Sequence, residues 1–156
     1  MEHSELYDIA PYLTDSNYEE VLKKTVQVMV SPSNLRVLVA EDNLANLKIV
    51  QLILKPYISI IDTAGNGLIA FEKFKVNKYD IIFMDIHMPE MDGYEGTQKI
   101  REYEKENNMT PVKIIAMTAI EMNEETELCL KFGMNQYLHK PFKRSDIIKI
   151  IRLLPS

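Results

Sequence analysis

The sequence is poor in the residues on which several protein classes depend. Among its 156 residues there are one cysteine, no tryptophan and five glycines. Because a single cysteine, Cys129, forms no disulfide within the chain, nothing favours a secreted, disulfide-rich fold. A chain of this length buries roughly two thirds of its unfolded surface on folding, so we expect a stable core without disulfides.

Long apolar segments and basic patches are also lacking. The longest apolar runs, such as Ile81–Met84 and Ile114–Met117, are far shorter than the roughly 18 residues of a membrane helix. The start, Met1–Glu5, lacks the basic and apolar regions of a signal peptide. The net charge is -5, most of it from residues 1–34, which hold six acids and two lysines. We therefore expect a cytoplasmic protein that binds neither a membrane nor nucleic acid.

From residue 35 onwards, short apolar or β-branched segments alternate five times with longer amphipathic segments. This alternation is typical of a parallel sheet flanked by helices. The expected strands cover residues 35–40, 58–63, 81–84, 112–117 and 136–138. The expected helices cover residues 44–55, 67–76, 92–105, 123–133 and 144–154. We predict one α/β domain of the (βα)5 type over residues 35–156.

Residues 1–34 form a separate N-terminal extension in this interpretation. A capping-box pattern at Ser16–Glu19 precedes apolar residues at helical spacing, which predicts one amphipathic helix over about residues 16–29. Its apolar stripe must dock on another surface. We expect it to pack against the α/β domain; the alternative is a surface for a partner or for a homodimer.

Polar residues follow four of the five predicted strands. They are Glu41 and Asp42, Asp85, Thr118, and Lys140. In an open parallel sheet, ligands bind beyond the carboxyl ends of the strands, so these side chains are expected to meet. Three neighbouring carboxylates repel one another unless a cation lies between them, and oxygen ligands favour Mg2+. A carboxylate nucleophile, a metal, a lysine and a hydroxyl fit phosphoryl transfer, with Asp85 as the central acceptor.

Four segments then carry a family resemblance: Val39–Asn43, Met84–Gly93, Met117–Ala119 and Lys140–Phe142. In this order and spacing they resemble the response-regulator receiver domain of two-component (phosphorelay) signalling, closest in wording to receivers of hybrid sensor histidine kinases. The resemblance covers residues 35–156. It implies a flavodoxin-like, doubly wound parallel sheet with strand order 2-1-3-4-5.

The resemblance also implies a role for individual residues in binding the phosphoryl group and the metal. Asp85 matches the phosphoacceptor, and Glu41 and Asp42 match the acidic pair that holds Mg2+ with it. His87 matches the position whose backbone carbonyl completes the metal site. Lys140 matches the lysine that pairs with the phosphoryl oxygens.

Two further residues match the switch of this family. Thr118 corresponds to the hydroxyl that moves towards phosphorylated Asp85, and Tyr137 to the aromatic side chain that turns into the space it leaves. Pro141 follows Lys140, where the family usually has a cis peptide. The expected result is a new surface on the fourth helix, the fifth strand and the fifth helix, which a protein partner reads.

The expected function is therefore a phosphoaccepting signalling module and not a turnover enzyme. A histidine kinase or a histidine phosphotransfer protein would donate the phosphoryl group. Only 16 residues follow Lys140, so we expect no DNA-binding output domain. The starting Met1 mildly favours a stand-alone regulator over an excised hybrid-kinase receiver. Because apolar Ile120 cannot orient an attacking water, we expect a phosphoryl group that outlasts those of fast motility regulators.

Two alternatives stay open. One is a receiver-like interaction scaffold that is not phosphorylated, which the complete acidic set and Lys140 disfavour. The other is a phosphatase with an aspartyl nucleophile, of the haloacid-dehalogenase type. Those sites resemble Asp-x-Asp after the first strand, whereas Asp85 follows the third strand and has His87 two residues later.

Overall fold

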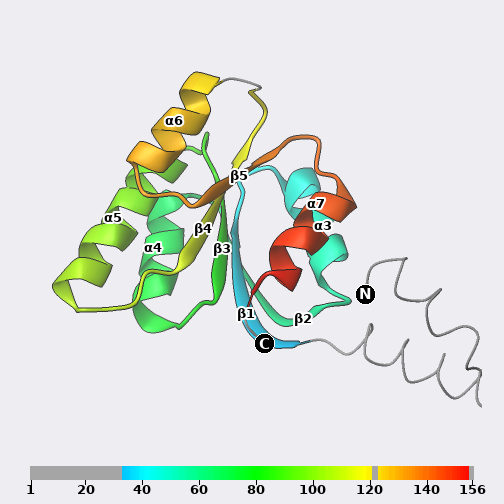
Figure 1. Ribbon diagram of the computed structural model, residues 1–156, viewed down its shortest axis with the longest axis horizontal. Coiled ribbons are helices and arrows are strands. Elements are labelled where there is room, and N and C mark those ends of the chain that lie inside the picture. The colour runs from blue at the N-terminus through cyan, green and yellow to red at the C-terminus, as the bar shows by residue number, and fades with distance from the viewer. Residues whose placement is uncertain (1–32, 121–122, 155–156) are drawn as a thin grey trace, which may run out of the picture. The chain divides into compact units, whose positions relative to one another are not determined.

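The computed structural model describes residues 33–120 and 123–154. They form a five-stranded parallel sheet in the order β2-β1-β3-β4-β5 (Figure 1). The strands are β1 (Ser33–Ala40), β2 (Ile58–Ala64), β3 (Ile81–Asp85), β4 (Lys113–Thr118) and β5 (Gln136–His139). The helices are α3 (Leu44–Leu54), α4 (Gly67–Val76), α5 (Gly93–Glu106), α6 (Asn123–Lys131) and α7 (Arg144–Arg152).

The (βα)5 prediction and the strand order are confirmed, and each predicted boundary lies at most two residues from the observed one. The predicted N-terminal helix over residues 16–29 lies outside the described residues. In the described part of the chain, no helix is long and apolar enough to cross a membrane.

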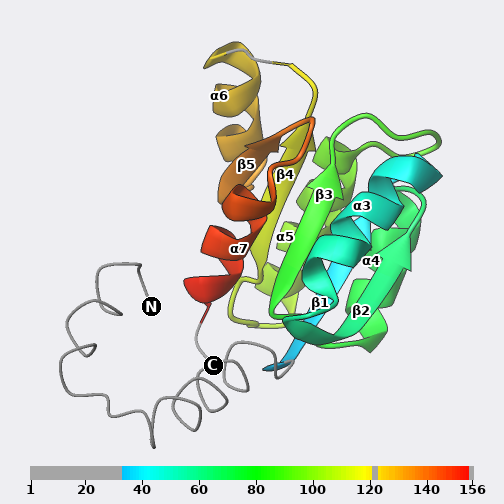
Figure 2. The same cartoon turned by 90° about the vertical axis from the view of Figure 1, so that its right-hand side faces the viewer.

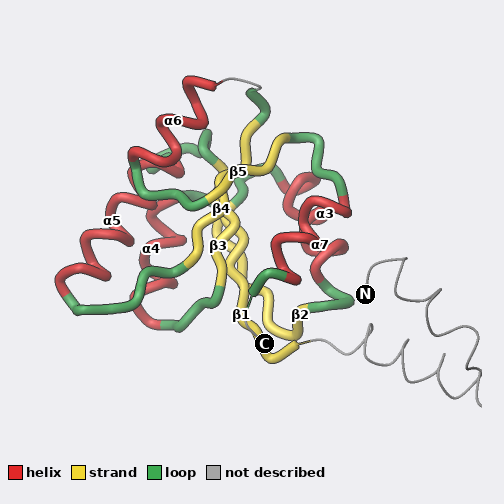
Figure 3. Tube along the Cα trace, viewed as in Figure 1, coloured by secondary structure: helices red, strands yellow, loops and turns green. Residues whose placement is uncertain are grey.

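Helices cover both faces of the sheet. Figures 1 and 2 show α3 and α7 on one face and α4, α5 and α6 on the other. Along the tube in Figure 3, each strand is followed by a helix, which is the doubly wound arrangement. The five residues of β3 are buried, because this central strand has a helix layer on each side. Two apolar cores therefore form, one on each face.

The loops at the carboxyl edge of the sheet are held by helix caps. The side chain of Asn43 caps α3, that of Asn66 caps α4 and that of Asp92 caps α5. Asp92 Oδ1 accepts a hydrogen bond from the Glu95 backbone N–H at 2.8 Å. Each cap satisfies an N–H group that the first helical turn leaves unpaired, which defines where the loops end.

Candidate functional site

Three carboxylates gather at the carboxyl edge of the sheet, as predicted. Glu41 directly follows β1 and Asp85 ends β3, and the two strands pair with Ala40 opposite Met84. This register places Glu41 beside Asp85. One oxygen from each of Glu41, Asp42 and Asp85 lies within 4.8 Å of the others. Glu41 and Asp85 are buried, whereas Asp42 is exposed.

A lysine from the loop after β5 enters this cluster. The Lys140 Nζ lies 2.7 Å from Glu41 Oε2 and 3.1 Å from Asp85 Oδ1. Its backbone N–H donates to the Thr118 carbonyl oxygen at 2.6 Å, which ties the loop to the end of β4. The following peptide bond, Lys140–Pro141, is cis, as the family resemblance implies. One cation thus serves two buried carboxylates.

The charges in this cluster do not balance. Burial, and then the charge of Glu41, raise the pKa of Asp85 to about 7, although Lys140 acts in the opposite direction. For Lys140, burial alone would lower the pKa, but the contacts with Glu41 and Asp85 outweigh it and raise the pKa. Three acids facing one lysine leave an excess of negative charge, and their oxygen atoms are the ligand type that Mg2+ prefers. The residues therefore fit a divalent cation.

The Thr118 hydroxyl, at the end of β4, forms its hydrogen bonds with residues outside this cluster. It donates to Glu125 Oε2 of α6 at 2.6 Å and accepts from the Ile120 backbone N–H at 3.1 Å. The ring of His87 contacts the same carboxylate, with Nε2 3.2 Å from Glu125 Oε1. Glu125 is buried, whereas the His87 side chain is 65% exposed. Glu125 is thus a further polar residue beside the switch position.

Sequence reasoning missed Glu125. It is one of three acids in the sequence Asn-Glu-Glu-Thr-Glu, and a run of this kind usually forms a solvated helix start. One signal was available: Glu125 lies four residues before Cys129, which puts both on the same helix face. Cys129 is buried, so that face points inward.

Tyr137 lies on β5, next to β4, the strand that ends in Thr118. It is opposite Ala116 of β4, and 49% of it is exposed. The side chain is therefore about half in contact with solvent. The structure describes one arrangement of Thr118 and Tyr137, so their roles in a switch stay predictions.

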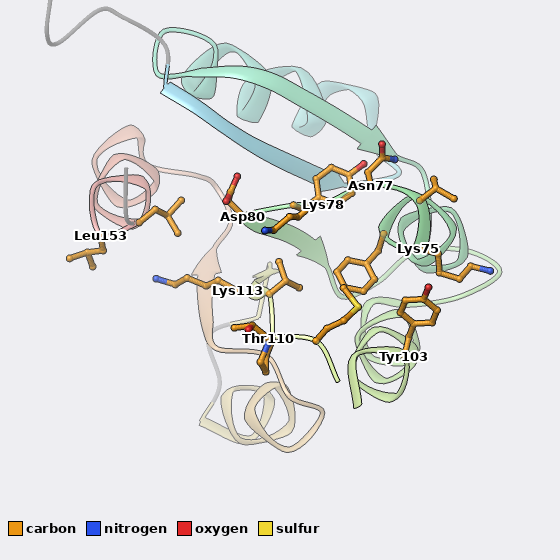
Figure 4. Close-up of a pocket in the computed structure, with 15 residues that line it drawn as sticks. Lys75, Asn77, Lys78, Asp80, Tyr103, Thr110, Lys113 and Leu153 are labelled. Atoms are coloured by element: carbon orange, nitrogen blue, oxygen red, sulfur yellow. The ribbon is translucent and has the colours of Figure 1, made fainter. Parts of the chain in front are cut away.

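A cavity lies at the other end of the sheet (Figure 4). It measures about 840 Å³ and is lined by residues that precede or begin β3 and β4, among them Asp80 and Lys113. Lys75 and Lys78 border it as well. Asp85 and Thr118 end the same two strands, so the cavity is separate from the carboxylate cluster.

A flavodoxin-like sheet with acids and a lysine at its carboxyl edge defines a receiver-type protein. Residues 37–152 match the response regulator receiver domain, and the chain belongs to this family.

Hybrid sensor kinases are among its relatives. The chain is 42% identical over 137 residues to hybrid signal transduction histidine kinase B of Dictyostelium discoideum, which covers 83% of this chain and 7% of the kinase. It is 35% identical over 116 residues to the sensor histidine kinase GacS of Pseudomonas protegens, covering 74% of this chain and 13% of GacS. The chain thus spans a small part of these curated relatives.

Solved receiver structures are similar as well. One is a chain of the co-crystal structure of the Saccharomyces cerevisiae histidine phosphotransfer protein Ypd1 with the receiver domain of the response regulator Ssk1. It has a TM-score of 0.73 and 31% identity, and the match covers 78% of this chain and 88% of that one. Another is the receiver domain of the sensor histidine kinase PA1611 of Pseudomonas aeruginosa, with magnesium in its active-site cleft. Its TM-score is 0.67, with 34% identity over 77% of this chain and 96% of that one.

Proposed function

We propose that this chain accepts a phosphoryl group on Asp85 from a phosphohistidine of a histidine kinase or a histidine phosphotransfer protein. Glu41, Asp42 and Asp85, with the backbone carbonyl of His87, would hold Mg2+. The observation that carries the proposal is the buried contact of Lys140 with Glu41 and Asp85, in a cluster with excess negative charge. The magnesium ion in the related PA1611 receiver supports the same assignment.

The transfer needs one bond to form and one to break. A carboxylate oxygen of Asp85 attacks the phosphorus atom, and the bond from phosphorus to the donor's imidazole nitrogen breaks. The imidazole keeps the electron pair and takes a proton from solvent. Lys140, 3.1 Å from Asp85 Oδ1, is placed to neutralise the transferred phosphoryl oxygens. When bound, Mg2+ supplies further positive charge for these oxygens.

The output side of the proposal is a surface change read by a protein. Thr118 would turn towards the phosphoryl group, and Tyr137 would follow inward. The elements α6 and β5 carry exposed apolar side chains in this state, including Leu128 at 41%, Leu130 at 59% and Tyr137 at 49%. A partner that buries such side chains would sense the rearrangement, and the chain itself would turn over no substrate beyond its own phosphoryl group.

The observed geometry also bears on the two alternatives. An aspartyl phosphatase of the Asp-x-Asp type needs a second acid two residues after the nucleophile. That position is His87, whose ring contacts Glu125. A scaffold that is not phosphorylated would have no need to bury Glu41 and Asp85 side by side around Lys140, because burying like charges destabilises a fold.

The direct test is a phosphate-affinity gel after incubation with Mg2+ and acetyl phosphate. We expect a retarded band from the wild type, and no such band after Asp85→Asn or with a chelator present. Asp80→Asn is the matched control, since Asp80 lines the cavity at the opposite end of the sheet, and it should behave as wild type. Absence of the retarded band from folded wild-type protein that binds Mg2+ would favour the scaffold.

A further inference from the structure

The Thr118 hydroxyl is already committed to a partner in this structure. Its single proton is donated to Glu125 Oε2 at 2.6 Å, and both residues are buried. A hydrogen bond of this length to a carboxylate is of the strong, charge-assisted kind. Because a hydroxyl has one proton, Thr118 cannot donate to Glu125 and to a phosphoryl group on Asp85 at the same time.

We propose that Glu125 is a positioning residue that competes with the phosphoryl group for the Thr118 hydroxyl and so sets how readily the chain switches. This inference rests on the proposed function and adds a regulating residue to it. In the unphosphorylated state Glu125 holds Thr118 towards α6. Phosphorylation of Asp85 must overcome that hydrogen bond before the switch completes.

The surroundings of Glu125 differ from those of a buried acid that only supports the fold. Glu104 is such an acid: Arg101 lies 2.7 Å from one of its oxygens, and the Val112 backbone N–H donates to the other at 2.7 Å. Glu125 is contacted by the movable Thr118 hydroxyl and by the exposed ring of His87, and it lies near the Tyr94 hydroxyl. Its environment depends on a side chain that is expected to leave.

Release of Thr118 has a consequence for α6. A buried carboxylate that loses a hydrogen-bond donor is destabilised unless it finds another partner or reaches water. Glu125 lies in the first turn of α6 and near the Tyr94 hydroxyl, so we expect it either to take a new donor there or to reach water by a shift of this turn. The contact therefore links phosphorylation of Asp85 to the helix that borders the proposed output face. His87, two residues after Asp85, contacts the same carboxylate. It therefore provides a second connection between the loop after Asp85 and α6.

The test is the affinity of the full chain for beryllofluoride, a mimic of the phosphoryl group, in the presence of Mg2+. Glu125→Ala removes the competing acceptor, and we expect about tenfold tighter binding, equivalent to about 1.4 kcal/mol. Glu124→Ala is the matched control: it removes the same charge from the same helical turn, but Glu124 is exposed. It should leave the affinity within about twofold of wild type.

A double-mutant cycle with Thr118→Val separates positioning from plain electrostatics. If Glu125 acts through the hydroxyl, Glu125→Ala has no further effect on affinity in the Thr118→Val background. An equal gain in both backgrounds, or no gain in the wild-type background, would overturn the role of Glu125.

Glu125→Gln keeps the side-chain size and an acceptor, and should bind with intermediate affinity. It carries the test if the alanine variant does not fold. Wild-type protein that binds Mg2+ but not beryllofluoride would contradict the proposed function itself. The role of Glu125 would then fall with it, because no phosphoryl group would compete for Thr118.

Discussion

At the scale of single residues, the site depends on the ammonium group of Lys140, which interacts with two carboxylates at once. Its ammonium group contacts both Glu41 and Asp85, so it occupies the space between carboxylates that a metal ion also needs. Lysine and metal therefore both compensate the same negative charge. Their roles can be separated by substitution.

Replacing Lys140 by glutamine should separate the role of the lysine from that of the metal ion. We expect phosphorylation of Asp85 by acetyl phosphate to slow about tenfold or more, because a cation that stabilises the transferred oxygens is lost. Mg2+ should bind at least as tightly as to the wild type, since a competing positive charge is gone. Titration calorimetry measures the second quantity. Lys143→Gln, at an exposed position, is the control, and weaker Mg2+ binding by Lys140→Gln would contradict this prediction.

The raised pKa of Asp85 predicts a pH-dependent stability in the absence of metal. The pKa is about 7 in the folded state against an ordinary value of 3.8. Between these values the native state holds a proton that the unfolded state has released, so stability falls as the pH rises through this window. Asp85→Asn should therefore raise the melting temperature of metal-free protein, by about 3–8 °C at pH 8 and by less at pH 5. Equal gains at both pH values would argue against a buried, charged Asp85.

Adding Mg2+ should make the wild type more stable than Asp85→Asn, the reverse of the order without metal. The ion binds the folded wild type and stabilises it by mass action, whereas Asp85→Asn has lost one of the three carboxylates. Thermal melts at pH 8 with and without Mg2+ measure both effects. A wild type that gains no stability from millimolar Mg2+ would contradict the metal assignment.

At the scale of elements, the start of α5 lies very close to the end of β3. A Cβ added to Gly93 would collide with the backbone carbonyl oxygen of Asp85, and the Gly93 N–H donates to the Ile86 carbonyl oxygen at 2.8 Å. The absence of a side chain at Gly93 is thus what allows the helix to begin directly against the strand that ends in Asp85.

Gly93→Ala should destabilise the chain by about 1–3 kcal/mol, because backbone must move to accept the added methyl group. Urea denaturation followed by circular dichroism measures the change. Gly65→Ala is the matched control: nothing lies within 4 Å of a Cβ built there, so its effect should stay within about 0.5 kcal/mol. Equal stability of the two variants would show that the contact at Gly93 relaxes without cost.

The elements themselves were predictable, since their signals are local. Strands with buried faces read as short apolar runs, and caps such as Asp92 mark helix starts. The meeting of Glu41, Asp85 and Lys140 also followed from the sequence, because parallel strands bring their carboxyl ends to one edge. The direction of the Thr118 hydroxyl could not be predicted in this way. It depends on which acid of α6 faces inward, and that is decided by packing between elements far apart in the sequence.

At the scale of the whole molecule, the described fold is complete within residues 33–154. The five strands are paired, and each face of the sheet has its own apolar core. The family match begins at residue 37. None of the proposed site residues lies in residues 1–32.

A variant lacking residues 1–32 should therefore fold and keep Mg2+-dependent phosphorylation of Asp85. The phosphate-affinity gel and circular dichroism measure this, and loss of either would contradict the division of the chain into an extension and a receiver domain. Thermal melts and sedimentation of both forms distinguish the two roles expected of the extension, packing against the domain and self-association. A lower melting temperature at unchanged mass indicates packing against the domain, and a change in mass indicates self-association.

The contact between Thr118 and Glu125 also bears on the background signal of the molecule. A switch fluctuates, and a fraction of unphosphorylated molecules adopts the signalling arrangement spontaneously. If the contact is worth about 1.4 kcal/mol, it lowers that fraction about tenfold. The same contact weakens the response to a phosphoryl group by the same factor. Glu125 therefore lowers the background signal of the unphosphorylated chain and, to the same extent, lowers its response to phosphorylation.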